Sequence, residues 1–321
     1  MISAKSRVWS AGAHKRPERG ERMKYGYIGL GNLGGHIAMS LIKAGHQVVV
    51  YDRDPALAER HVAAGAVLAT SVTDLAGQVD HVFTCLPSPA VSELVLAEML
   101  ITLKPGATWI ENSTIGRDDI RRLGGLAKGS DIRLLEAPVT GGVHLAARGE
   151  ITVLVGGDAD LFALHEPALR AIGNRIFHMG PLGSAAVIKV ITNMLAFIHL
   201  VADGEALMLA KRGGLDLKTA WEAIAASSGS SFVHETEGQL ILNGSYDIAF
   251  SMDLALKDLG FAMGFGREFG VPLDLAGMTA QTFVKGKAAY GGAAQSTQIV
   301  KLLEDALGTD LRAEGFPARL E

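Results

Sequence analysis

Lys189 and Asn193 are four residues apart in the apolar stretch AAVIKVITNMLAF. A helix through this stretch would place both side chains on one face. A lysine in such surroundings either extends its ammonium group to solvent or holds it in a cleft. In a cleft, desolvation lowers the pKa of a lysine toward neutrality, which suits proton exchange with an alcohol or carbonyl oxygen. The spacing alone leaves both interpretations open.

Three further groups of polar residues could contribute to a site. Thr140–Gly142 follow an apolar run and could offer a hydroxyl and backbone N–H groups to a carboxylate, or could form a plain tight turn. Ser113–Thr114 follow a predicted strand that ends near Ile110, where a loop would face a ligand crevice, although such a pair is also a common helix cap. Lys257–Asp258 resemble an ordinary surface ion pair by spacing.

A glycine-rich motif with the right context lies in residues 25–52, YGYIGLGNLGGHIAMSLIKAGHQVVVYD. An apolar run leads into Gly29, Gly31 and Gly34, an amphipathic helix follows, and a second apolar run delivers Asp52. These glycines allow a sharp turn, close approach of the backbone to a pyrophosphate, and close packing of helix on strand. The order of strand, turn, helix, strand and acid predicts a dinucleotide-binding βαβ unit.

The choice of dinucleotide depends on the end of the second predicted strand, YDRD. Asp52 can accept hydrogen bonds from both ribose hydroxyls and would repel a 2′-phosphate, which favours NAD. Arg53 could instead stack on adenine or pair with that phosphate. We therefore expect NAD, with NADP as the alternative.

The sequence around these motifs predicts an α/β domain followed by a helical domain. Strand-like and helical segments alternate from residue 25 to residue 178, which predicts a doubly wound, mostly parallel sheet. From Gly183 onward the pattern is helical, beginning with one long helix over residues 185–212 that only Gly204 interrupts. We expect a dinucleotide-binding Rossmann domain over residues 23–181 and an all-α substrate and oligomerisation domain over residues 182–321.

Residues 1–22 differ from the rest of the chain. They mix basic residues with Ser, Gly and Pro and show no apolar period, so we expect a disordered extension that ends before Met23. An organelle transit peptide is the alternative, but Glu18 and Glu21 count against it.

Composition excludes several classes of protein. With 48% hydrophobic and 20% charged residues, the 321-residue chain can bury a sizeable core. The net charge of −4 comes without a basic stripe, so nucleic acid is not an expected partner. The single cysteine, Cys85, excludes an intrachain disulfide and is compatible with the cytoplasm. No uninterrupted apolar run reaches the roughly 18 residues of a membrane span, and we expect no metal site.

Together these motifs resemble the β-hydroxyacid dehydrogenase family, which includes 3-hydroxyisobutyrate dehydrogenase and tartronate semialdehyde reductase and is related to 6-phosphogluconate dehydrogenase. The resemblance covers essentially everything after Met23. It rests on five ordered segments: IGLGNLG in the glycine turn, CLPS at residues 85–88, EAPVTGG at 136–142, GSAAVIKVITN at 183–193 and LKDL at 256–259.

The resemblance implies a hydride transfer between NAD(P) and a small 3-hydroxy acid, or its semialdehyde, in a homodimer or homotetramer assembled through the helical domain. Lys189 matches the family's catalytic lysine, and the implied substrate-binding residues are Thr140, Gly141, Gly142, Lys189 and Asn193. The expected cofactor-binding residues are Gly29, Leu30, Gly31, Asn32, Leu33, Gly34, Asp52, Arg53, Leu86, Pro87, Thr114 and Lys257.

Some positions depart from the commonest family pattern. Thr140 stands in place of serine, Glu136 in place of aspartate, Thr192 in place of asparagine, and Gln295 where aspartate is common. The change at Gln295 affects the expected substrate more than the reaction. Residues 227–232 and the Gln295 segment are candidates for lining the substrate site.

Two alternatives to this function remain. One is an imine reductase on the same scaffold, although such relatives usually lack a lysine at the position of Lys189. The other is a non-catalytic dinucleotide-binding module, which the retained lysine disfavours. Turnover of hydroxy acids would distinguish the dehydrogenase from both.

Overall fold

The computed structural model describes residues 23–320 and divides the chain into two compact units, with the boundary between Lys189 and Val190. Each unit has a hydrophobic core of its own. The extension expected over residues 1–22 lies outside the described residues.

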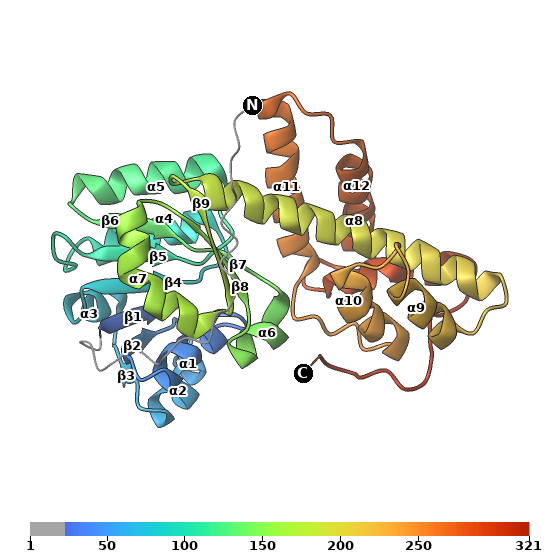
Figure 1. Ribbon diagram of the computed structural model, residues 1–321, viewed down its shortest axis with the longest axis horizontal. Coiled ribbons are helices and arrows are strands. Elements are labelled where there is room, and N and C mark those ends of the chain that lie inside the picture. Colours follow the sequence, from blue (N-terminus) through green and yellow to red (C-terminus); the bar gives the residue numbers. More distant parts are fainter. Residues whose placement is uncertain (1–22, 321) are drawn as a thin grey trace. The chain divides into compact units, whose positions relative to one another are not determined.

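Within the described part of the chain, the first unit contains one nine-stranded sheet with the order β3-β2-β1-β4-β5-β6-β8-β7, and β9 pairs with β8 (Figure 1). Strands β1 to β6 run parallel to one another and β9 runs parallel to β8, whereas β8 runs antiparallel to β6 and β7. The mostly parallel, doubly wound sheet is confirmed. The strands are β1 (Lys24–Ile28), β2 (Gln47–Tyr51), β3 (Val67–Leu68), β4 (His81–Thr84), β5 (Thr108–Glu111), β6 (Arg133–Glu136), β7 (Val139–Thr140), β8 (Thr152–Gly156) and β9 (Arg175–Gly180).

Helices cover both faces of this sheet, because each face carries its own apolar cluster (Figure 1). Residues of α1 (Gly34–Lys43), α6 (Gly142–Arg148) and α7 (Ala159–Ile172) pack on one face. Residues of α3 (Val72–Gly77), α4 (Pro89–Met99) and α5 (Arg117–Gly129) pack on the other. After β2 the chain forms a 3-10 helix, η1 (Pro55–Ala58), which is followed by α2 (Glu59–Ala63).

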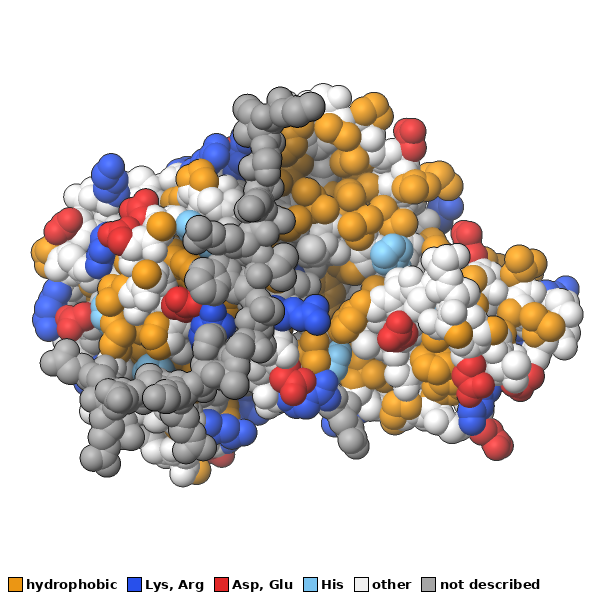
Figure 2. Space-filling model, in the orientation of Figure 1, with side chains coloured by type: hydrophobic (Ala, Val, Ile, Leu, Met, Phe, Trp, Pro, Cys, Tyr) orange, Lys and Arg blue, Asp and Glu red, His pale blue; other side chains and the backbone are white. Residues whose placement is uncertain are grey.

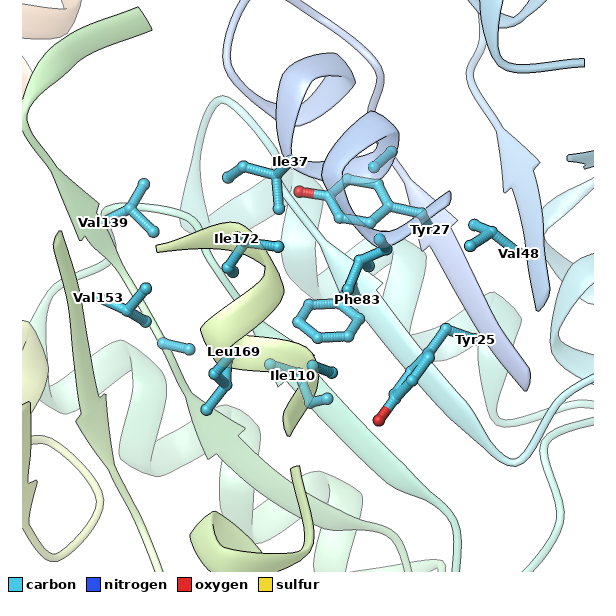
Figure 3. Packing of buried hydrophobic residues seen from close by; sticks show 14 of the residues in the cluster. Tyr25, Tyr27, Ile37, Val48, Phe83, Ile110, Val139, Val153, Leu169 and Ile172 are labelled. Carbon is cyan, nitrogen blue, oxygen red and sulfur yellow. The ribbon is translucent and has the colours of Figure 1, made fainter. Parts of the chain in front are cut away.

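The alternation of side chains along the central strands decides which cluster each residue joins. Tyr25 and Tyr27 of β1 and Phe83 of β4 enter the cluster under α1 and α7, as Figure 3 shows. Ile28 and Val82, one position away on the same two strands, enter the opposite cluster. Because successive side chains of a strand point to opposite faces, strands covered on both faces are apolar throughout.

The second unit is built from helices. They are the remainder of α8 (Ser184–Arg212), α9 (Leu217–Ala225), α10 (Phe232–Asn243), α11 (Met252–Phe269), α12 (Asp274–Tyr290), the 3-10 helix η2 (Ser296–Val300) and α13 (Lys301–Leu307). Helix α8 continues through Gly204, where an added Cβ would lie 2.8 Å from Cγ2 of Val300. This glycine therefore lets η2 pack closely on α8 rather than interrupting the helix.

Helix α8 is also long and apolar enough to cross a membrane, the one such helix among residues 23–320. About a third of its most apolar window is buried, and core helices of other proteins satisfy the same criteria of length and composition. This property alone assigns no membrane to the protein.

Candidate active site

The turn between β1 and α1 has the geometry that a bound pyrophosphate requires. Gly29 has φ +95°, and a Cβ there would lie 2.3 Å from the carbonyl oxygen of Cys85. A Cβ at Gly34 would lie 2.1 Å from the carbonyl oxygen of Gly29, whereas no described atom lies within 4 Å of a Cβ built at Gly31. Helix α1 begins without a side-chain cap, so its first N–H groups can meet an anion in the open space over Gly31.

Asp52, just past β2, is held beside this turn. Its carboxylate accepts a hydrogen bond from the backbone N–H of Leu30 at 2.6 Å and from that of Asp54 at 2.9 Å. A carboxylate has about four lone-pair sites, so the group can still accept from ribose hydroxyls. Arg53 is exposed next to it. The residues present therefore fit a dinucleotide.

The loops after β4 and β5 are joined by hydrogen bonds. The backbone N–H of Leu86 donates to Oγ of Ser113 at 2.7 Å, and the backbone N–H of Ser113 donates to Oε1 of Glu111 at 2.8 Å. Helix α5 is capped at Gly116 instead, so the helix-cap interpretation of Ser113–Thr114 is wrong. Leu86, Pro87 and Thr114 lie in the loops that follow the carboxyl ends of β4 and β5, and ligands bind at this edge of the sheet in doubly wound folds.

A buried polar layer supports these loops. Glu111 is fully buried at the end of β5, and burial raises the pKa of its carboxyl group above the ordinary value. The next residue, Asn112, donates from Nδ2 to the carbonyl oxygen of Ala137 at 2.7 Å. The ends of β5 and β6 are therefore linked through side chains as well as through the sheet.

Thr140–Gly142 occupy the connection between β7 and α6. Thr140 pairs with Thr152 of β8 and is half-buried. Gly141 has φ +125° and Gly142 has φ +86°, backbone angles that residues with a side chain rarely adopt. The chain thus turns here in a conformation that needs both glycines and leaves the segment at the end of a strand.

Lys189 lies in the second turn of α8 and is buried, with 8% of its surface exposed. The start of this helix is attached to β6 by Glu136, whose carboxylate accepts N–H groups of Gly183, Ala185 and Ala186. Burial raises the pKa of Glu136, while these three donors and the charge of Arg121 oppose the rise. Of the two interpretations of Lys189, extension into open solvent does not hold.

Asn193 follows one turn later on α8, already in the second unit. Its Nδ2 donates to Oδ2 of Asp258 on α11 at 2.6 Å. Asp258 is 1% exposed and also pairs with Lys257 at 3.2 Å. The surface-pair interpretation of Lys257–Asp258 is therefore wrong, since Asp258 is a buried support for Asn193. The position of Asp258 next to Lys257 in the sequence does not indicate that Asp258 is buried against Asn193.

The segments expected to line the substrate site have local roles in the second unit. Gln295 accepts the backbone N–H of Phe250 at 3.2 Å through Oε1. Ser231 caps α10 by accepting the backbone N–H of His234 at 3.0 Å.

The expected site residues thus form two groups. In the first unit the structure brings the glycine turn, Asp52 and the loops after β4 and β5 to the carboxyl edge of one sheet. In the second unit it brings Asn193 and Lys257 together through Asp258. Among residues 23–320 no group of three or more His, Cys, Asp or Glu side chains could hold a metal ion.

Comparison with known proteins identifies the family. Residues 24–180 match the family model described as the NAD-binding domain of 6-phosphogluconate dehydrogenase. Residues 183–303 match the model described as NAD-binding of NADP-dependent 3-hydroxyisobutyrate dehydrogenase. The chain belongs to the β-hydroxyacid dehydrogenase family. The resemblance that the sequence motifs carry is thereby confirmed.

Similar curated proteins cover nearly the whole chain. 2-(Hydroxymethyl)glutarate dehydrogenase of Eubacterium barkeri is 32% identical, over 90% of this chain and 97% of the relative. L-Threonate dehydrogenase of Cupriavidus necator is 31% identical, over 86% and 95%. The solved 3-hydroxyisobutyrate dehydrogenase of Mycobacterium tuberculosis with L-serine is 28% identical, with a TM-score of 0.79 over 88% of this chain and 99% of that one.

This β-hydroxyacid dehydrogenase is accordingly an NAD(P)-dependent oxidoreductase that acts on CH–OH donors. An imine reductase from a Pseudomonas species is 19% identical, with a TM-score of 0.62 over 88% of this chain, and shares the fold. The expected family, fold class and use of a nicotinamide dinucleotide are confirmed.

Proposed function

We propose that this enzyme oxidises a small 3-hydroxy acid to its semialdehyde, or reduces the semialdehyde, with NAD as the preferred cofactor. The observation that carries the proposal is a buried lysine, Lys189, near the start of a helix tied to the dinucleotide-binding sheet. The names of several relatives support the substrate class, since 2-(hydroxymethyl)glutarate, L-serine and 3-hydroxyisobutyrate are all carboxylic acids with a hydroxyl group on carbon 3.

The site residues take separate roles in this proposal. Thr140, Gly141 and Gly142 bind the substrate carboxylate through a hydroxyl and backbone N–H groups, and Asn193 helps to hold the substrate. The glycine turn, with Leu30, Asn32 and Leu33, binds the pyrophosphate, and Asp52 binds the adenine ribose while Arg53 lies beside it. Leu86, Pro87, Thr114 and Lys257 contact the rest of the cofactor. The roles of Asn193 and Lys257 come from the family resemblance.

Lys189 accepts and donates the proton of the substrate hydroxyl group. In the oxidative direction its neutral amine accepts the hydroxyl proton as the carbon–oxygen double bond forms, and in the reductive direction its ammonium group returns that proton to oxygen. The bound dinucleotide supplies the exchange of a hydride with the same carbon. The carboxylate-binding segment fixes the substrate so that hydroxyl and lysine meet.

The defining experiment is a panel of hydroxy acids and semialdehydes assayed with NAD and with NADP. We expect turnover of 3-hydroxy acids and a higher kcat/KM with NAD. Turnover of cyclic imines without any turnover of hydroxy acids would refute the proposal. Binding of the dinucleotide without turnover of any compound would refute it in favour of a non-catalytic module.

The presence of two compact units suggests that each has its own role. We propose that residues 23–181 bind most of the dinucleotide, to which Lys257 adds a contact, and that residues 182–321 serve substrate selection and assembly into a homodimer or homotetramer. Exposed apolar side chains on α11 and α12 support the assembly, and Figure 2 shows hydrophobic side chains gathered over these helices. A cytoplasmic location completes the proposal, and the single thiol of Cys85 is compatible with it.

A further inference from the structure

Glu136 is a buried carboxylate that accepts hydrogen bonds at the N-terminus of α8, the helix that carries Lys189. It is the last residue of β6, and 2% of its surface is exposed. Oε1 accepts the backbone N–H of Gly183 at 2.5 Å and of Ala185 at 3.0 Å, and Oε2 accepts that of Ala186 at 3.0 Å. A single side chain therefore binds three donors at the start of α8.

These contacts fix both the position and the rotation of the first turn of α8. The first N–H groups of a helix have no partner within the helix, and an acceptor that binds several of them restrains the helix along its axis and around it. Lys189 is four residues beyond Ala185, so the two lie on the same helix face one turn apart. The restraint at Ala185 is therefore passed to Lys189 through one rigid helical turn.

The same strand end leads into the segment proposed to bind the substrate carboxylate. Thr140 comes four residues after Glu136, and the intervening Ala137 is held by Nδ2 of Asn112 through its carbonyl oxygen. Opposite Glu136, Gly156 of β8 leaves room for the carboxylate, because a Cβ there would lie 2.0 Å from Oε1. The anchor of α8 and the carboxylate-binding segment thus share one short, restrained stretch of chain.

We propose that Glu136 is a positioning residue that sets Lys189 in register with the carboxylate-binding segment Thr140–Gly142. This inference rests on the proposed role of Lys189 in proton transfer. Glu136 itself acts only through α8. Its glutamate reaches one methylene further than aspartate, and Gly156 provides the space for that extra length.

The test compares Glu136→Gln and Glu136→Asp with the wild-type enzyme. Glutamine keeps the size but replaces one acceptor oxygen by an NH₂ group that faces a backbone N–H, so α8 must shift. We expect kcat to fall about 10- to 100-fold, because displacement of a reacting group by about 1 Å can cost 100-fold. KM for the hydroxy acid and the Kd of the dinucleotide should change little. Glu136→Asp, which keeps both acceptor oxygens, should lose less than Glu136→Gln.

A second comparison separates positioning of Lys189 from general support of the fold. In a Lys189→Ala background, turnover is restored with added ethylamine, and the Glu136→Gln change is then introduced. Because free amine needs no helix to position it, the rescued rate should be nearly the same with and without Glu136→Gln. As a control, Glu166→Gln alters a partly exposed ion pair with Arg170 on α7 and should leave kcat unchanged.

The possible results distinguish the positioning role of Glu136 from the proposed role of Lys189. Wild-type kcat in Glu136→Gln, or an equal loss in the amine-rescued background, would overturn the positioning role. If Glu136→Gln does not fold, the same two comparisons with Glu136→Asp decide the matter, and equal losses with and without Lys189 overturn the role. Full turnover in Lys189→Ala would instead refute the proposed function, independently of Glu136.

Discussion

At the scale of single residues, the proposed reaction depends on the environment of Lys189. Its burial on a helix that begins at the sheet suits a group that exchanges protons rather than one that only aids solubility. We expect Lys189→Met to lower kcat by about 10²- to 10⁴-fold, the usual contribution of general acid–base catalysis. Isothermal titration should find the Kd of the dinucleotide nearly unchanged.

A suitable control for that variant is Lys128→Met, because Lys128 is exposed in the last turn of α5. It should behave as the wild-type enzyme in the same assays. Normal kcat in Lys189→Met would show that another group carries the proton.

In the proposed function, the preference for NAD over NADP depends on Asp52. Its carboxylate is already oriented by the N–H groups of Leu30 and Asp54, so it is held ready for ribose hydroxyls. Asp52→Asn should raise the Kd for NAD about 10- to 100-fold, since hydrogen bonds to a charged group contribute about 1.5–3 kcal/mol. The Kd for NADP should change less or fall, because the repulsion of the 2′-phosphate is lost.

Fluorescence titration with both dinucleotides measures this change. The neighbouring Asp54→Asn, which weakens only the cap of η1, provides the control and should leave the NAD-to-NADP ratio unaltered. Tighter binding of NADP than of NAD by the wild-type protein would contradict the expected preference.

At the scale of elements, the packing of β1, β4 and α7 encloses polar rings at the amino edge of the sheet. The hydroxyl of Tyr25 lies 3.2 Å from Nδ1 of His165, and the rings of His81 and His165 have centroids 4.7 Å apart. Desolvation lowers the pKa of His165 to about 3, with a smaller contribution from the charge of His81. The folded protein therefore keeps this imidazole neutral over a range where the unfolded chain protonates it.

This difference makes stability depend on pH in a defined direction. In the unfolded chain His165 is protonated below about pH 6.5, whereas in the folded protein it stays neutral down to about pH 3. The folded protein is therefore destabilised relative to the unfolded chain as the pH falls through this window. We expect His165→Asn to reduce the slope of unfolding free energy against pH, between pH 6 and 4, by up to about 1.4 kcal/mol per pH unit. Urea unfolding at several pH values measures it.

The exposed His199 of α8 offers a matched control, since His199→Asn should retain the wild-type slope. Equal slopes for wild type and His165→Asn would show that another buried group dominates the acid response.

At the scale of the whole molecule, the helical unit exposes several large apolar side chains. Leu275 and Met278 of α12 are 65% and 70% exposed, and Phe269 and Val271 add to the same part of the chain. Such patches mark protein interfaces. We expect Met278→Lys, alone or with Leu275→Lys, to shift the proposed oligomer toward smaller species, because a charge would be buried at the contact. Light scattering after size exclusion gives the mass directly.

Leu126→Lys on α5 of the first unit is the control, because Leu126 is also exposed but lies outside the helical unit. Its oligomer should have the wild-type mass. A wild-type protein that is monomeric, or a Met278→Lys variant of unchanged mass, would rule out assembly through this face.

Local pattern was sufficient for much of the fold, though not for all of it. The alternating strands and helices of the first unit and the long helix α8 were predicted because their apolar periods are strong. The period is weak in helix α10, since its segment FVHETEGQLILN places polar residues early and Gly238 in its middle. The antiparallel direction of β8 was missed, because the period of a strand carries no information about its partner.

The sequence by itself determined the reaction class of this protein. The glycine turn and Asp52 are local motifs whose residue types and spacing imply a nucleotide turn, and the resemblance that the ordered motifs carry implies the proton-exchanging role of Lys189. Only the tertiary structure decided how those groups are supported. Glu136 binds N–H groups 47 to 50 residues away, and Asp258 binds Asn193 from 65 residues away. Such contacts depend on which surfaces meet when the chain folds, and spacing along the sequence does not encode that.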